Sequence, residues 1–189
     1  MSITKSDRIS SGFTIVELLI VIVVIAILAV ISIVAYNGVQ SRAENTVTIN
    51  GVTAYMKALA LYAAEHGEYP TIALYPCMGN PTGNLCGRLS GSGGCSYSGG
   101  TNMNANFDAD LAPYLGSSKP TISNQTMICT NGEVYRGAYV NKNDTNPKML
   151  TFQVYLKNTT CPSTFGPARV TATGQSEELT RCVGMMPTL

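Results

Sequence analysis

The chain has 189 residues with 12 Lys and Arg against 11 Asp and Glu, and charged residues make up only 12% of it. A formal net charge of +1 disfavours non-specific electrostatic binding to nucleic acid or to an anionic membrane surface. The single histidine, His66, excludes a multi-histidine metal site. Six cysteines, all at or beyond Cys77, are an even number that can pair, which indicates an oxidising compartment.

Residues 1–12 form a short polar leader with Lys5 and Arg8, and residues 13–36 form an apolar segment. This segment includes an uninterrupted apolar run, Leu18–Ile31. As a helix the segment would span about 36 Å, enough to cross a hydrocarbon core of about 30 Å. A cleaved secretory signal is the alternative, but such signals have apolar regions of about 7 to 15 residues and a small-x-small cleavage site that is missing here. The segment therefore predicts a retained transmembrane helix.

Residues 37–67 are predicted to continue this helix as an amphipathic stretch. Gly38 and Gly51 are weak points, because glycine costs about 1 kcal/mol relative to alanine in a helix. Gly67 suits a left-handed helix cap and Pro70 prevents continuation, so the helix is expected to end there. The predicted apolar face, with residues recurring at helical spacing, consists of Val39, Ala43, Val47, Val52, Met56, Leu59 and Ala63.

Residues 68–189 contain all nine prolines and most of the glycines, which predicts a globular domain of turns, loops and strands. Strands are expected at residues 134–140 and 149–157, because both stretches are rich in apolar and β-branched residues and the second alternates at period two. The turn-rich connection NKNDTNPK predicts an antiparallel hairpin between them. The apolar face of the preceding helix is the expected cover for this hairpin.

A short helix is expected at residues 108–115, with Asp108 as its N-cap and Pro113 limiting it to a single turn. Asp108 and Asp110 could alternatively contribute to a calcium site. Two carboxylates fall short of the about six to eight oxygen ligands that calcium takes, which favours the capping role. No metal or other cofactor is expected.

The junction Gly12-Phe13-Thr14-Ile15-Val16-Glu17 lies between the leader and the apolar run. A carboxylate in an apolar helix costs about 2.5 to 3.5 kcal/mol at the bilayer centre, so Glu17 requires an explanation. One explanation is that it lies near the helix start, where it reaches the interface and meets the positive end of the helix dipole. The segment GFTIVELLIVIVVIAILAV, however, strongly resembles the N-terminal signature of type IV pilins and pseudopilins. The resemblance continues through AYNGVQSRA and YAAEHGEYP to about residue 70.

This resemblance implies cleavage after Gly12 by a prepilin peptidase, N-methylation of the new terminus Phe13, and a role in assembly for Glu17. The Glu17 carboxylate would pair with the Phe13 ammonium of a neighbouring subunit in the filament core and fix the axial register. The fold implied is α+β and pilin-like: a long N-terminal helix, transmembrane in its first half and amphipathic in its second, packed on a small antiparallel β-sheet with disulfide-stapled loops. The implied partners are the prepilin peptidase, other pilins and the pilus assembly platform of the cytoplasmic membrane.

Lys5 and Arg8 precede the apolar helix, which predicts a single-pass protein of the cytoplasmic membrane with its N-terminus in the cytoplasm. Assembly would then carry it into an extracellular pilus or a periplasmic pseudopilus. A minor pilin or secretion pseudopilin acting as a tip adhesin or binding module is one alternative. A membrane-anchored enzyme is another, but the sequence has no Gly-x-Ser-x-Gly run. Lys and Arg are scattered singly in the outer domain, so no nucleic-acid partner is expected.

The six cysteines allow fifteen pairings. We expect Cys161 to pair with Cys182, because the segment between them offers little apolar surface and would be poorly held at the chain end. A local pair across a Gly-Asn-Pro turn is expected for Cys77 and Cys86. Elimination leaves the pair Cys95 and Cys129. Zinc binding is disfavoured, since the spacing of nine residues from Cys77 to Cys86 differs from that of C-x2-C sites.

Overall fold

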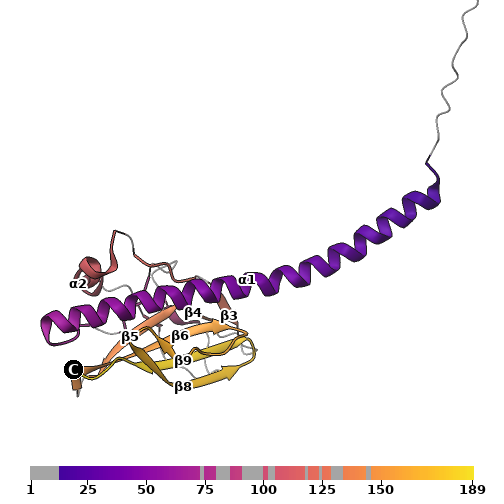
Figure 1. The fold of residues 1–189 in the computed structure, drawn as a ribbon. Coiled ribbons are helices and arrows are strands. Elements are labelled where there is room, and N and C mark those ends of the chain that lie inside the picture. The colour runs from indigo at the N-terminus through magenta and orange to yellow at the C-terminus, as the bar shows by residue number, and fades with distance from the viewer. Residues whose placement is uncertain are drawn as a thin grey trace, which may run out of the picture. The chain divides into compact units, whose positions relative to one another are not determined.

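The structure is a computed structural model that describes residues 13–72, 75–79, 86–90, 100–101, 105–117, 119–123, 125–128, 134–143 and 146–189. The chain forms two compact units, Met1–Val39 and Gln40–Leu189. The helix α1, Ile15–His66, supplies the described part of the first unit and the longest element of the second (Figure 1). The long helix and the antiparallel sheet described below make the fold α+β and pilin-like, as predicted.

Helix α1 ends where the sequence predicts. Gly67 has a φ of +75°, and its N–H donates to the carbonyl of Ala63 at 2.9 Å, which is a left-handed cap. The predicted apolar face is only partly correct. The residues of that face that are buried are Val52, Met56, Leu59 and Ala63, whereas Val39, Ala43 and Val47 remain exposed.

Two antiparallel sheets make up the rest of the second unit. The larger has the strand order β5-β6-β9-β8-β7, and the smaller has the order β2-β1-β4-β3. The strands of the larger sheet are β5 Ala138–Asn143, β6 Asn146–Lys157, β7 Thr164–Phe165, β8 Ala168–Ser176 and β9 Leu179–Met185. The strands of the smaller sheet are β1 Cys86–Ser90, β2 Gly100–Thr101, β3 Thr126–Ile128 and β4 Val134–Arg136.

The predicted hairpin is present as β5 and β6, with Tyr139 opposite Gln153. Its first strand differs from the prediction, because residues 134–140 divide at Gly137. Gly137 has a φ of +69°, a left-handed conformation that turns the backbone and is open to glycine. The residues before it therefore join the smaller sheet as β4, and those after it join the larger sheet as β5.

The short helix is longer than predicted. Helix α2 spans Ala105–Leu115, so Asp108 lies in its first turn and not at the cap. Pro113 lies inside the helix, where it removes the hydrogen bond to the carbonyl four residues earlier and its ring crowds that carbonyl. Phe107 and Leu111 are fully buried, and we attribute the extra turns to this burial, which offsets the lost bond.

The main core lies between α1 and the larger sheet. Its largest members include Tyr55 and Met56 of α1 and Phe152 of β6, and Phe152 meets Phe165 edge to face at 5.4 Å between ring centroids. A second cluster gathers side chains of both sheets around a disulfide: Cys77, Cys86, Met127, Tyr135, Tyr139, Tyr155 and Leu179.

The segment between Cys161 and Cys182 contains more regular structure than its sequence indicates. Strand β9 lies between β6 and β8 and pairs with both along its length. Cys182 faces Val154 on one side and Thr173 on the other. The Thr and Val residues of these strands favour extended backbone even where little apolar surface is buried.

Both predicted disulfides within the described residues are confirmed. Cys77 and Cys86 are bonded with their Cα atoms 5.7 Å apart, and so are Cys161 and Cys182, again at 5.7 Å. The predicted pair of Cys95 and Cys129 lies outside the described residues.

Candidate assembly site on the N-terminal helix

The first turn of α1 is closed by a reciprocal cap between Thr14 and Glu17. The Thr14 N–H and hydroxyl donate to Glu17 Oε2 at 2.9 and 2.7 Å, and the Glu17 N–H donates to the Thr14 hydroxyl at 3.2 Å. This is a capping box, in which a Thr and a Glu three residues apart each satisfy a backbone donor of the other. The carboxylate of Glu17 is thereby held at the positive end of the helix.

Phe13 itself is 78% exposed and precedes the helix. Gly12, the predicted last residue of the leader, lies outside the described residues. Of the three predicted site residues, the structure thus places Phe13 just before α1 and Glu17 in its first turn. Their predicted roles in N-methylation and charge pairing remain predictions.

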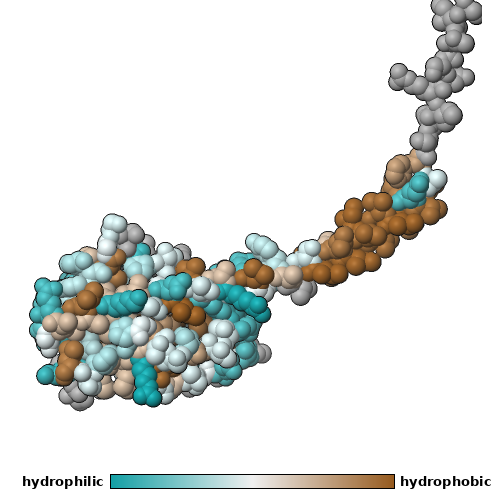
Figure 2. Space-filling view, viewed as in Figure 1, coloured by the Kyte–Doolittle hydropathy of each residue, from teal (hydrophilic) through white to brown (hydrophobic). Residues whose placement is uncertain are grey.

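The apolar half of α1 leaves its side chains exposed. Every described residue from Phe13 to Tyr36 is exposed, and the exposed fraction of its large hydrophobic residues ranges from 85% for Ile15 to 47% for Val23. Figure 2 shows this half as a continuous hydrophobic surface on the visible side. Monomeric soluble proteins rarely expose apolar patches larger than a few hundred Å². Such a surface requires lipid or other protein around it.

Polar groups in this half are satisfied within the helix. The Ser32 hydroxyl donates to the carbonyl of Leu28 at 2.8 Å, so it needs no partner from outside. Among the described residues, α1 is the one helix long and apolar enough to cross a membrane. Backbone groups of a helix are paired internally, which is the condition for a segment surrounded by hydrocarbon.

The other half of α1 is fastened to the larger sheet by a buried asparagine. Asn45 is 6% exposed, and its Nδ2 donates to the carbonyl of Lys157 at 2.7 Å while its Oδ1 accepts from the Lys157 N–H at 3.0 Å. One side chain thus satisfies both backbone groups at the end of β6. An unpaired buried backbone group costs about 1 to 3 kcal/mol, so this contact contributes substantially to holding the helix on the sheet.

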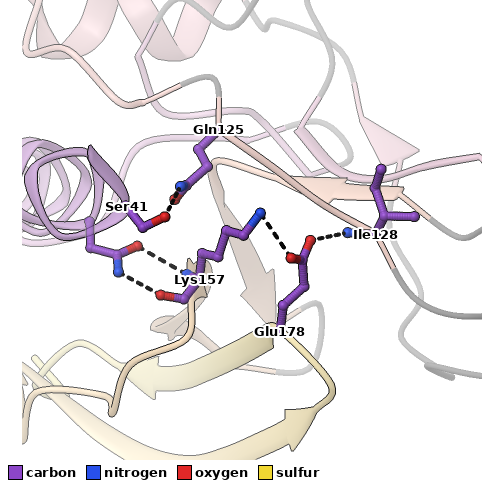
Figure 3. A network of polar contacts seen from close by, with 6 residues as sticks. Ser41, Gln125, Ile128, Lys157 and Glu178 are labelled. Carbon is purple, nitrogen blue, oxygen red and sulfur yellow. Dashed lines mark hydrogen bonds and ion pairs between the residues drawn. The ribbon is translucent and has the colours of Figure 1, made fainter. Parts of the chain in front are cut away.

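The contact at Lys157 continues into both sheets, as Figure 3 shows. Lys157 Nζ lies 2.8 Å from Glu178 Oε2, and Glu178 Oε1 accepts from the N–H of Ile128 in β3 at 2.8 Å. On the helix side, Gln125 Nε2 donates to the Ser41 hydroxyl at 3.2 Å. We call Ser41, Asn45, Gln125, Ile128, Lys157 and Glu178 the polar clamp.

A neighbouring contact fixes the segment that precedes β3. The Ser123 hydroxyl donates to Glu44 Oε2 at 3.3 Å, and the Ser123 N–H donates to the hydroxyl of Thr48 at 3.3 Å. Residues 41–48 of α1 are therefore tied to other segments of the globular unit through side-chain hydrogen bonds.

The other candidate residues have local roles. Asp108 forms an ion pair with Lys119 at 2.8 Å, and the described residues contain no group of three or more His, Cys, Asp or Glu side chains that could hold a metal ion. His66 is exposed at the end of α1 and stacks on Tyr62 at 4.0 Å between ring centroids. These contacts offer no constellation of nucleophile and base.

The sequence reasoning missed the partner of Glu17 and the whole polar clamp. The cap had a local signal, since Thr14-x-x-Glu17 is the capping-box pattern directly before an apolar run. The clamp had none, because Asn45 and Lys157 are 112 positions apart in the sequence.

Comparison with known families agrees with this geometry. Residues 7–33 match the family described as the prokaryotic N-terminal methylation motif, which is the class III signal peptide of type IV pilins. No curated protein and no solved structure matches the chain significantly. The motif indicates a type IV pilin- or pseudopilin-like prepilin, and it implies processing by a prepilin peptidase and assembly with other pilins.

Proposed function

We propose that this type IV pilin-like prepilin is a structural subunit of a pilus-like filament, cleaved after Gly12 and polymerised through the N-terminal half of α1. The observation that supports this most directly is the match at residues 7–33 to the methylation motif, which leads into an apolar helix exposed on all sides. We also propose that the chain first lies in the cytoplasmic membrane with its N-terminus in the cytoplasm, where the assembly platform extracts it. It has no catalytic role in this proposal.

The position of Glu17 supports a role in register. The carboxylate lies in the first turn of α1, one turn beyond the residue that becomes the new N-terminus. In a dry filament core, an unpaired carboxylate would be costly, and the Phe13 ammonium of a neighbouring subunit is the nearest complementary charge that this chain can supply. Only one axial stagger between neighbouring helices brings the two together.

Exposed apolar residues on the second half of α1 support further contacts between subunits. Val47 and Leu61 are 41% and 56% exposed, although both belong to the helix that forms the core of the globular unit. Apolar side chains left outside a domain core are available for packing against a neighbouring helix.

Mass spectrometry of filaments sheared from cells tests the proposal. The mature protein should begin at Phe13 and carry one methyl group on that nitrogen. Gly12→Leu should leave the chain uncut and absent from the sheared fraction, while the control Gly38→Ala should be processed normally, since a Cβ at Gly38 has no atom within 4 Å. A mature chain that starts at Met1 or beyond Ala35 would contradict the proposal.

The amount recovered decides which kind of subunit the chain is. Abundant mature protein in the sheared fraction would identify a major pilin, and trace amounts would identify a minor pilin at a tip. Complete absence, with normal processing in the membrane, would favour a short periplasmic pseudopilus.

A further inference from the structure

The side chain of Tyr55 on α1 is enclosed by other segments of the globular unit. The ring of Phe107 in α2 stacks on the Tyr55 ring, with 6.3 Å between the centroids and 6° between the planes. The backbone of Gly79 lies near the hydroxyl and lowers the pKa of the phenol in part. Tyr55 is consequently 0% exposed. A hydroxyl in such a place needs a hydrogen-bond partner within the structure.

The carboxylate of Asp108 belongs to the same corner of the core. Asp108 follows Phe107 in the first turn of α2, its side chain is 11% exposed, and its charge raises the pKa of the Tyr55 phenol. Its Oδ2 lies 2.8 Å from Lys119 Nζ. Lys119 begins the segment that crosses α1 one turn before Tyr55, where a Cβ at Gly51 would lie 2.2 Å from a carbonyl oxygen. The stacked rings and this crossing hold α1 and the start of α2 together.

Two buried oxygen atoms in this corner lack a hydrogen-bond partner. Neither Tyr55 Oη nor Asp108 Oδ1 forms a hydrogen bond with any of the described residues, so the two do not bond each other directly. Their requirements are complementary, because the hydroxyl has a proton to donate and the carboxylate only accepts. The N–H of Gly79 approaches Oη, but an N–H is itself a donor and leaves the hydroxyl proton without an acceptor.

We propose that one buried water molecule links the Tyr55 hydroxyl to Asp108 Oδ1. The water accepts a hydrogen bond from the hydroxyl and donates one to the carboxylate, so that both oxygen atoms gain a partner. Internal waters typically make about three hydrogen bonds to buried polar groups that would otherwise be unsatisfied. The Gly79 N–H, beside the hydroxyl, is the third polar group of this site.

The local charges favour water over a cation. Lys119 already neutralises the carboxylate of Asp108, so the corner has no surplus negative charge to attract an ion. The N–H of Gly79 also presents the positive end of its dipole to the site. Calcium would need about six to eight oxygen ligands. The described residues contain no group of three or more His, Cys, Asp or Glu side chains that could hold a metal ion.

The water joins α1 to the first turn of α2 through hydrogen bonds that the two helices do not make directly. A single enclosed water is not bulk solvent, so burial still raises the pKa of the Tyr55 phenol. This inference does not depend on the proposed function, because the site lies in the core of the globular unit and not on the apolar half of α1.

The sign of a stability change tests the site. If the Tyr55 hydroxyl has no partner, Tyr55→Phe removes an unsatisfied group and should leave stability unchanged or raise it. With the water present, Tyr55→Phe should lower the folding equilibrium constant at pH 7 about five-fold, because the water loses a partner. Urea titration of the detergent-solubilised full chain measures the change, with Tyr36→Phe, outside the globular unit, as the control. Unchanged or increased stability in Tyr55→Phe would overturn the proposal.

The same substitution in an Asp108→Ala background tests the link between the two side chains. There, Tyr55→Phe should change the folding equilibrium constant by less than about two-fold, because the bridge is already broken. Loss of the ion pair with Lys119 is common to both members of this comparison and cancels. An undiminished five-fold effect in this background would show that the hydroxyl bonds elsewhere, and would overturn the proposal.

A crystal structure of the full chain in detergent identifies the occupant. A water should appear as a density peak about 2.6 to 3.2 Å from both Tyr55 Oη and Asp108 Oδ1. A peak at metal-ligand distances of about 2.3 to 2.6 Å would identify a cation and overturn the proposal. So would a direct hydrogen bond between the two oxygen atoms, or a site without density.

Discussion

The two halves of α1 use apolar side chains in opposite ways. From Phe13 to Tyr36 the helix is apolar around its whole circumference, and all its described side chains are exposed. From Gln40 to His66 apolar residues concentrate on one face, where Tyr55, Met56 and Leu59 are fully buried. A helix that is apolar around its whole circumference needs lipid or other protein chains to cover it. A helix with one apolar face can bury that face in its own domain.

The hydrogen-bond partners of polar side chains also differ between the two halves of α1. In the first half, Glu17 bonds with Thr14 and Ser32 bonds with Leu28, each within one turn. In the second half, Asn45 and Thr48 bond with residues more than seventy positions away. The polar groups of the first half thus bond within the helix itself, while those of the second half bond to distant parts of the globular unit.

The largest expected effect is on filament formation by variants of Glu17. Substitutions at Glu17 and Thr14 can distinguish a role in local helix capping from a role in assembly. Glu17→Gln retains a capping-box partner but removes the charge, and Thr14→Ala removes the cap but retains the charge. If the charge pairs with Phe13 of a neighbour, Glu17→Gln and Glu17→Val should abolish filaments in cells that express only the variant. Thr14→Ala should weaken the first turn by about 1 kcal/mol and still assemble.

The measurement is the amount of mature protein in the sheared fraction, with membrane-extracted protein as the reference. Insertion should persist in every variant and improve for Glu17→Val, since the replacement removes a carboxylate from the apolar segment. Normal filaments from Glu17→Gln, combined with their loss in Thr14→Ala, would mean that Glu17 acts as a cap and not as a charged partner.

Two glycines of α1 provide a matched comparison of the two halves. A Cβ at Gly51 would lie 2.2 Å from the Thr121 carbonyl oxygen and 2.7 Å from Ile122 Cδ1, whereas one at Gly38 would meet nothing within 4 Å. Gly51→Ala should therefore lower the free energy of unfolding of the globular unit by about 3 kcal/mol through overpacking. Gly38→Ala should leave it unchanged, because its helix gain of up to about 1 kcal/mol falls outside that unit.

Urea titration of the detergent-solubilised chain, followed by near-ultraviolet circular dichroism, measures both changes. Equal stability of the two variants would mean that residues 119–123 do not approach α1 as closely as the structure shows. The close approach also explains why glycine occurs in the middle of a helix, where it otherwise destabilises.

A smaller effect is expected from the polar clamp. Asn45→Ala leaves the N–H and the carbonyl of Lys157 without their side-chain partners, which should cost about 2 kcal/mol in the free energy of unfolding. Asn50→Ala, an exposed asparagine on the same helix, should change it by less than about 0.5 kcal/mol. Similar values for the two variants would show that the clamp is not a major fastening of helix to sheet.

What the sequence predicted well depends on local signals. The length of α1 follows from an unbroken apolar run and from Gly67 and Pro70 at its end, and the hairpin of β5 and β6 follows from alternation at period two. The disulfide of Cys77 and Cys86 links residues nine positions apart, so chain proximity alone favoured it.

What the sequence did not predict depends on distant contacts. The division of residues 134–140 at Gly137 depends on the pairing of β4 with β1 and β3, which come from other segments of the chain. Strand β8 has no clear local signal, because its Thr, Gly, Gln and Ser residues give no alternation of apolar side chains. Helix α2 was underestimated because its burial against the core, through Phe107 and Leu111, outweighs the local effect of Pro113.

The smallest expected effect is the response of the second half of α1 to alkaline pH. Burial raises the pKa of Tyr55 to about 12; the Gly79 backbone lowers it in part and the Asp108 carboxylate raises it further. The folded pKa lies above the unfolded value of about 10, so this stabilising contribution is complete below pH 10 and is lost as the pH rises through 12. At pH 11 the ionisation of Tyr55 lowers the free energy of unfolding by about 1 kcal/mol.

Tyr55→Phe removes the titrating hydroxyl and retains the ring, so it should reduce the difference in unfolding free energy between pH 9 and pH 11 by about 1 kcal/mol. Tyr36→Phe, at an exposed tyrosine outside the globular unit, is the control and should leave that difference unchanged. Part of the alkaline loss should persist in Tyr55→Phe, because burial also raises the pKa of Tyr139 and Tyr155 in the second cluster. An identical pH dependence in wild type and Tyr55→Phe would mean that the Tyr55 hydroxyl reaches water, and hence that the packing of α1 against α2 and the sheet is looser than the structure shows.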